Sequence, residues 1–334
     1  MILLLTACGD KKNGTEDSAT DGTDDIGALI AEVDQRIISS PRNADLFAER
    51  ARLNARRDSV TQALNDWKRA IALDSTKSEF HLGIGDLFFQ KVRMEEAERY
   101  MRKASELDPK APEPRLKLAE IKLLERNYKE AMGWANDALR LDQQNARGYF
   151  LKGWIHMEAG DTTLAISSYR TAVEQDPSMQ EAFVQLGVLH AAKGDPLAMQ
   201  YYRTALDLDP NSTETLYALG MFAQENGLDS LAISCYDRIK ELDPKEVLAW
   251  YNSGYIYLEH KKDPNAARAQ FTRAIGMSPK FTEAYFNRGL AYELEGKLDS
   301  SYMDYRKALT LQPNYTPAAI AVERLQTKGL RVQR

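Results

Sequence analysis

The four histidines are the side chains of this chain best suited to hold a metal ion or to move a proton near neutral pH. Two of them, His156 and His190, are 34 residues apart and occupy the same position in two consecutive repeats, so they could lie close together. No Cys, Asp or Glu beside them completes the ligand set that zinc requires. We therefore expect each imidazole to fill a core position that other repeats fill with an aromatic ring, such as Tyr257 or Tyr292. The sequence predicts no metal site.

Motifs of the common enzyme classes are missing from the sequence. No glycine-rich phosphate loop follows a strand pattern, and neither a nucleophile elbow nor a zinc-protease motif occurs. The longest basic clusters are pairs such as Arg56-Arg57 and Lys261-Lys262, which are too weak to attract a phosphate backbone. The sequence therefore predicts a protein that is not an enzyme, uses no cofactor and binds no nucleic acid.

Cys8 is a candidate for covalent lipid attachment. Leu5-Thr6-Ala7-Cys8 resembles the lipobox of bacterial lipoproteins, in which small residues precede a cysteine that is lipidated after cleavage. The apolar run within residues 1–8 is too short to span a membrane. The basic residue that usually precedes the apolar core of a signal peptide is missing. A start codon placed too far downstream would explain why it is missing. The resemblance implies anchoring through Cys8 to a bacterial envelope membrane, and Gly9 points to the outer membrane, facing the periplasm. The alternative is a chance LTAC sequence.

A polar segment separates Cys8 from the rest of the chain. Residues 9–25 contain six acids and two lysines, and so carry -4 of the formal net charge of -5. Their Gly/Thr/Asp-rich composition cannot bury apolar surface, and we expect a flexible acidic tether. Cys235 lies far from this segment, so we expect a small half-buried helix residue and no disulfide with Cys8.

From residue 44 onward the sequence repeats itself at 34 residues. Each unit contains two helical patterns separated by a turn, and a glycine such as Gly160 ends the first helix in a left-handed conformation. Asp-Pro pairs such as Asp108-Pro109 end the second helix in four units. The fifth unit is one residue short and the seventh one residue long, and both changes fall in the turn. The units are 44–77, 78–111, 112–145, 146–179, 180–212, 213–246, 247–281 and 282–315.

Three positions of the repeat are small in almost every unit. The eighth is Ala or Gly, the twentieth is Ala or Ser, and the twenty-seventh is Ala in all units but one. Small residues at these positions let two antiparallel helices approach closely. Large residues at the fourth and twenty-fourth positions, such as Phe183 and Tyr202, would fill the space between units.

This pattern resembles the tetratricopeptide repeat family over residues 44–315. The resemblance implies an all-α fold, a right-handed superhelical solenoid of eight helix-turn-helix units whose first helices line the concave face. Because each unit contacts only its neighbours, the ends need caps. Residues 26–43 supply an N-terminal capping helix and linker. Residues 316–334 supply a C-terminal capping helix and tail.

The concave face is the candidate binding site. The fifth and ninth positions of each first helix lie four residues apart and form one stripe. The ninth is Arg52, Asp86 and Glu120 in the first three units, whereas the last five carry apolar and aromatic residues typical of partner-binding surfaces. The alternative is that position five is often aromatic in the family and that natural units vary freely at position nine. The predicted partner-binding groove is lined by Phe150, Trp154, Val184, Val188, Tyr217, Met221, Tyr251, Tyr255, Phe286 and Leu290.

Acids such as Glu181 recur at the second position of the units and could indicate a basic partner. They also lie in the first helical turn, where the helix dipole favours a negative charge, and we favour that explanation. The predicted function is a non-catalytic adaptor, tethered to the bacterial envelope through lipidated Cys8, that binds a protein or peptide segment in the groove of units four to eight. The alternative is a self-associating structural scaffold whose groove is filled by another copy.

Overall fold

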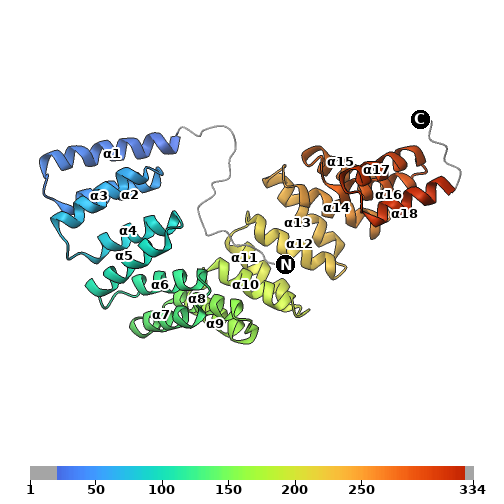
Figure 1. Cartoon of the computed structure of the whole chain (residues 1–334). Coiled ribbons are helices and arrows are strands. Elements are labelled where there is room, and N and C mark those ends of the chain that lie inside the picture. The colour runs from blue at the N-terminus through green and yellow to red at the C-terminus, as the bar shows by residue number, and fades with distance from the viewer. Residues whose placement is uncertain (1–20, 328–334) are drawn as a thin grey trace. The chain divides into compact units, whose positions relative to one another are not determined.

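The computed structural model describes residues 21–327, which form eighteen helices and no strand (Figure 1). The chain divides into two compact units, with the boundary in the sequence between Asp161 and Thr162. Cys8 and residues 9–20 of the predicted tether lie outside the described residues. Within residues 21–327, no helix combines the length and the apolar character needed to cross a membrane.

Each predicted repeat range between residues 44 and 315 contains two helices, and the two of residues 146–179 belong to different compact units. The helices of the first compact unit are α1 (Asp21–Ser39), α2 (Ala44–Arg56), α3 (Val60–Leu73), α4 (Ser78–Gln90), α5 (Met94–Leu107), α6 (Glu113–Leu124), α7 (Tyr128–Leu141) and α8 (Ala146–Glu158). The helices of the second are α9 (Thr162–Gln175), α10 (Gln180–Ala191), α11 (Leu197–Leu208), α12 (Thr213–Glu225), α13 (Asp229–Leu242), α14 (Val247–Glu259), α15 (Pro264–Met277), α16 (Thr282–Leu294), α17 (Leu298–Leu311) and α18 (Thr316–Thr327).

The two capping helices are present, with one correction. The C-terminal cap α18 begins at Thr316, as the sequence predicts. The N-terminal cap α1 begins at Asp21, so residues 21–25, which the sequence analysis assigns to the flexible tether, are helical. A carboxylate such as that of Asp25 is favourable near a helix N-terminus, so an acidic composition does not stop the helix there.

The turn between the helices of a pair has a left-handed residue in all eight repeats within residues 44–315. Four of these residues are the predicted glycines, with φ between 66° at Gly194 and 86° at Gly160. The other four carry side chains: Asp58, Val92, Arg126 and Lys262. The turn conformation is therefore a property of the repeat, and it is retained where the sequence lacks glycine. For the β-branched Val92 such a backbone is strained.

An aspartate follows most of the second helices and fixes the direction of the chain into the next repeat. The Asp108 carboxylate accepts the backbone N–H of Lys110 at 3.0 Å, and Asp176 accepts that of Ser178 at 2.9 Å. The Ser178 hydroxyl also donates to Asp176, and these two bonds hold the pKa of Asp176 below its usual value. Such local bonds give the backbone a stable alternative to a further helical turn.

The small eighth position faces the large twenty-fourth position of the same repeat. A Cβ atom placed on Gly187 would lie 2.5 Å from Cε1 of Tyr202, and one on Gly254 would lie 2.7 Å from Cε1 of Phe271. The Tyr202 ring also packs against Phe222 of the next repeat, with 6.4 Å between ring centroids. The predicted close approach at the eighth position and the predicted large residue at the twenty-fourth are therefore confirmed in these two repeats.

Candidate functional site

The charged residues at position nine of the first three repeats are paired with the following repeat. Arg52 lies 3.4 Å from Glu79, and the Glu120 carboxylate accepts a hydrogen bond of 2.6 Å from Arg147. Although the sequence suggests an exposed polar position, Glu120 is only 6% exposed. These side chains link successive first helices and are not available to a partner without breaking those contacts.

Asp86 occupies the same position in the second repeat, and its environment is unusual. Its carboxylate lies 3.8 Å from the Lys117 ammonium, which also reaches Glu120 at 3.4 Å. The pKa of Asp86 is raised to about 6, mainly by burial; Lys117 opposes the shift, and the charges of Glu113 and Glu120 add to it. Asp86 and Glu120 thus share one lysine.

Two predicted groove residues, Phe150 and Trp154, lie on α8 in the first compact unit. Phe150 is buried, and the Arg147 guanidinium lies 5.4 Å from the centroid of its ring. Trp154 is half-buried and packs on an apolar cluster from α6, α7 and α8 that includes Leu116 and Ile155. Trp154 therefore supports the packing of these helices, and Phe150 offers little accessible surface.

The fifth-position residues of the second compact unit pack into the helix pairs. Val184 is buried, and Tyr217, Tyr251 and Phe286 are half-buried. Each of the three rings contacts a ring on the second helix of its own repeat, so these residues mainly hold the pairs together. The pairs are Tyr217–Tyr236 at 6.2 Å, Tyr251–Phe271 at 5.7 Å and Phe286–Tyr305 at 5.5 Å between centroids.

Two asparagines, which the sequence analysis missed, tie these rings to the next repeat. The Asn287 amide donates to the Tyr251 hydroxyl at 2.9 Å, and Asn252 lies 3.4 Å from the Tyr217 hydroxyl. Burial raises the pKa of Tyr251 to about 12, which keeps its hydroxyl neutral. The signal in the sequence is the recurrence of Asn at position six in two consecutive repeats, each one repeat after a tyrosine at position five.

The ninth-position residues of repeats five to eight form what we call the position-nine surface. Its members are Val188, Met221, Tyr255 and Leu290, one each from α10, α12, α14 and α16. Val188 is 37% exposed and Tyr255 36%, while Met221 and Leu290 are half-buried. Leu294, four residues after Leu290 on the same helix face, is 64% exposed and extends the surface. The predicted groove residues thus divide into an inner set at position five and an accessible set at position nine.

Three of the histidines, His81, His190 and His260, contact tyrosine rings. The His190 ring lies 5.1 Å from Tyr201 between centroids, and its Nδ1 is 2.7 Å from the Asp195 carboxylate. His156 and His190 belong to different compact units. Across residues 21–327 we find no group of three or more His, Cys, Asp or Glu that could hold a metal ion. Burial raises the pKa of the Cys235 thiol to about 11, so it stays protonated.

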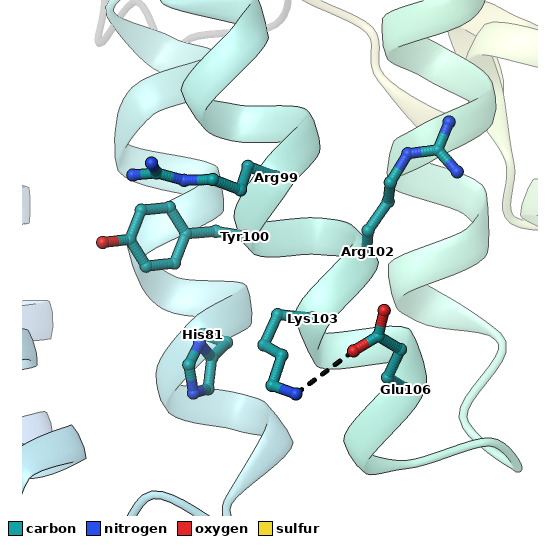
Figure 2. A pocket seen from close by; sticks show the side chains of 6 residues that line it. All are labelled: His81, Arg99, Tyr100, Arg102, Lys103 and Glu106. Carbon is teal, nitrogen blue, oxygen red and sulfur yellow. Dashed lines mark hydrogen bonds and ion pairs between the residues drawn. The ribbon is translucent and has the colours of Figure 1, made fainter.

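A pocket of about 430 Å³ between α4 and α5 gathers His81 and several basic residues (Figure 2). Its cations are largely occupied: the Lys103 ammonium lies 3.1 Å from Glu106, and the Arg99 guanidinium stacks 5.1 Å from the Tyr100 ring centroid. Burial lowers the pKa of His81, so its imidazole is neutral at physiological pH. The pocket therefore has little free positive charge with which to bind an anion.

Comparison with known proteins agrees with this geometry. Sequence models of the tetratricopeptide repeat match residues 48–112, 92–155, 150–213, 217–280 and 282–315. Among solved structures, the C-terminal part of a repeat protein from Cytophaga hutchinsonii superimposes with a TM-score of 0.62 at 19% identity, covering 75% of this chain and 99% of that one. At this identity the likeness shows the fold alone.

Curated relatives match over short stretches. The probable UDP-N-acetylglucosamine–peptide N-acetylglucosaminyltransferase SPINDLY of Solanum lycopersicum is 35% identical over 92 residues, which cover 28% of this chain and 10% of that protein. DnaJ homolog subfamily C member 7 of Homo sapiens is 29% identical over 98 residues, which cover 29% of this chain and 20% of that protein. This chain thus matches only a small share of the length of either relative.

Proposed function

This chain belongs to the tetratricopeptide repeat family, and from that premise we propose that it is a non-catalytic adaptor whose position-nine surface holds a segment of a partner protein. The repeats indicate a protein–protein interaction scaffold. The observation that carries the finer proposal is the exposure of Val188 and Tyr255, at 37% and 36%, on helices whose inner faces are fully packed. Apolar side chains held on a rigid helix supply much of the binding energy at protein interfaces.

The test compares Tyr255→Ala with Arg52→Ala, which removes an exposed side chain at the same repeat position. A native partner is first identified by affinity capture from the envelope and mass spectrometry, and its affinity for each purified variant is then measured. Tyr255→Ala should lower that affinity about thirtyfold, or about 2 kcal/mol, with little loss of stability. Arg52→Ala should change it less than threefold. Equal affinities for Tyr255→Ala and the unaltered protein would contradict the proposal.

We also propose that Cys8 carries the lipid anchor and places the protein at a bacterial envelope membrane, on the periplasmic face of the outer membrane. The support is Leu5-Thr6-Ala7-Cys8 followed by a polar segment. Acyl chains contribute about 0.8 kcal/mol per buried CH₂, so two or more hold a protein firmly. Expressed from its native start in a bacterium, the chain should incorporate labelled palmitate, and Cys8→Ala should abolish labelling and release the protein from membranes. Identical labelling of the two proteins would refute the anchor.

A self-associating scaffold is the second candidate, and exposed apolar side chains near the C-terminal end favour it. Leu294 on α16, Met303 on α17 and Ile320 on α18 are all largely exposed. Such side chains commonly mark sites of association. Light scattering at micromolar concentration separates the candidates, because a scaffold would give a mass of two or more chains and an adaptor that of one.

A further inference from the structure

Carboxylates border the position-nine surface on both sides. Positions two, nine and thirteen share one face of each first helix, because they lie seven and four residues apart. Glu181, Glu214 and Glu283 occupy position two of their helices. Glu225 and Glu259 occupy position thirteen. The position-nine surface therefore has glutamates on one side at α10, α12 and α16 and on the other side at α12 and α14.

Cations outside the first helices balance part of the acidic charge of this layer: Lys262 lies 3.7 Å from Glu259, and Arg324 lies 2.6 Å from Glu293. Within the layer itself the charge is not balanced. The four helices contain six glutamates and one basic residue, Arg288. The Arg288 guanidinium is already bound to Asp304, at 2.7 and 2.8 Å. Within residues 21–327, the position-two glutamates of α10, α12 and α16 make no ion pair.

In the first compact unit, position two carries both paired and unpaired acids. The acids of α2 and α4 have partners, Asp45 with Lys77 and Glu79 with Arg52, whereas Glu113 of α6 makes no ion pair among the described residues. The helix dipole favours an acid at position two in both units, so it explains the residue type but not the missing partners. Unpaired carboxylates beside exposed apolar side chains are what a cationic ligand requires.

Glu283 illustrates the kind of site that a cationic ligand would bind. Burial raises the pKa of Tyr251 and of Tyr315, and the negative charge of Glu283 adds to both shifts. The Tyr251 ring packs 4.7 Å from Phe281, and that of Tyr315 packs 5.6 Å from Phe286, between centroids. A lysine or arginine placed here would meet a carboxylate and aromatic rings together, which strengthens its binding.

We propose that the partner segment is an extended, cationic amphipathic peptide that directs apolar side chains to the position-nine surface and Lys or Arg to the bordering glutamates. This inference rests on the proposed function and adds the charge of the partner. Neighbouring helices lie about 10 Å apart, and an extended chain of the polyproline II type rises about 3.1 Å per residue with three residues per turn, so apolar side chains on one face would recur about every third residue. Nucleic acids and anionic lipid surfaces would be repelled.

The test uses the full chain and fluorescein-labelled peptides of twelve designed residues. One peptide repeats Leu-Lys-Ser, a second repeats Leu-Glu-Ser, and affinity is followed by fluorescence anisotropy at low and high salt. We expect the lysine peptide to bind at least tenfold more tightly than the glutamate peptide at low salt, and this difference to shrink as salt rises. Equal affinities for the two peptides would overturn the proposal.

Matched variants assign the effect to these glutamates. Replacing Glu181, Glu214 and Glu283 together by Gln should lower the affinity for the lysine peptide about tenfold. This figure assumes that three exposed ion pairs with the peptide are lost and that each contributes a factor of about two. The Asp45→Asn/Glu79→Gln double variant, in which the acids already have partners, should change it less than twofold. Circular dichroism verifies that both variants are folded. If the two variants bind alike, the inference is wrong.

Tyr255→Ala separates this inference from the proposed function. If it weakens binding of the native partner while the triple Gln variant binds that partner normally, the adaptor function stands and the cationic partner does not. If neither variant affects the native partner, both proposals fail. Loss of affinity in both, with reduced salt dependence in the triple Gln variant, supports both.

Discussion

Gly187 on α10 offers the sharpest test of the repeat packing. In Gly187→Ala the new Cβ would stand 2.5, 2.6 and 3.0 Å from Cε1, Cδ1 and Cζ of Tyr202, about 1 Å closer than an ordinary contact. Tyr202 is buried and packs on Phe222 of the next repeat, so neither the ring nor the helix can shift without disturbing a second interface. Overpacking of this kind costs about 1–3 kcal/mol.

Helix propensity acts in the opposite direction and calls for a control. Alanine favours a helix interior by about 1 kcal/mol over glycine. Gly133 lies inside α7, where a Cβ would meet nothing within 4 Å, so Gly133→Ala should stabilise the chain by about 1 kcal/mol. The free energy of unfolding of Gly187→Ala should be lower than that of Gly133→Ala by the cost of overpacking, about 1–3 kcal/mol, and that of Gly187→Leu should be lower still.

The measurement is urea unfolding followed by circular dichroism, with the midpoints of the variants compared. Replacing the ring in the double variant Gly187→Ala/Tyr202→Leu should recover part of the loss, because the two side chains are in direct contact. Equal shifts for Gly187→Ala and Gly133→Ala would refute the close approach of α10 to Tyr202, and with it the register of the repeats.

Three further predictions concern single sites. Val92→Gly should raise stability by about 0.5–1 kcal/mol, because Val92 is exposed with φ at 58°, whereas Gly227→Val should lower it; a urea midpoint that drops for Val92→Gly would contradict this. Folding raises the pKa of Asp86 from 3.8 to about 6, so its protonated form stabilises the fold below about pH 4, and that contribution is lost as the pH rises through 6. Asp86→Asn should therefore raise the free energy of unfolding by on the order of 1 kcal/mol at pH 7.5, a figure discounted for a side chain that is 38% exposed, and should leave it unchanged at pH 3.5. Thermal unfolding at the two pH values would show this difference. Trp154→Ala should destabilise the chain by about 2–4 kcal/mol because the ring packs on α6 and α7, whereas Tyr255→Ala should cost less than about 1 kcal/mol; similar melting temperatures would show that Trp154 does not support the core.

The repeat register could be predicted from the sequence because it rests on local constraints. A small residue at position eight, such as Gly254, and a large one at position twenty-four, such as Phe271, are forced by the distance between two packed helices. The left-handed turn at Gly160 follows from the freedom of glycine at positive φ. Its recurrence at Val92 could be inferred only from the alignment of the repeats, because the residue type argues against it.

The candidate site was only partly predictable. Positions five and nine share a helix face, yet Val184 is buried and Val188 is exposed, because position five turns toward the second helix of its own repeat. The burial of Glu120 depends on its ion pair with Arg147 in the next repeat. An ion pair between residues so far apart in the sequence cannot be recognised from the pattern within one helix. Helix α1 also begins earlier than the sequence predicts, because an acidic composition is typical both of a tether and of a helix N-terminus.

The hydrogen bonds from Asn252 and Asn287 bear on how quickly a partner can be captured. They fix Tyr217 and Tyr251 to the neighbouring repeat before anything binds. When the side chains beneath a binding surface are already fixed, few of them lose rotamer freedom on association. Each side chain that does become ordered costs about 0.5–1.5 kcal/mol of binding free energy. Capture should then proceed as a single bimolecular step, with a rate set by encounter and electrostatic steering rather than by rearrangement of the receptor. The ordering entropy in such a complex falls almost entirely on the partner segment, which reaches the surface unfolded and leaves it unfolded.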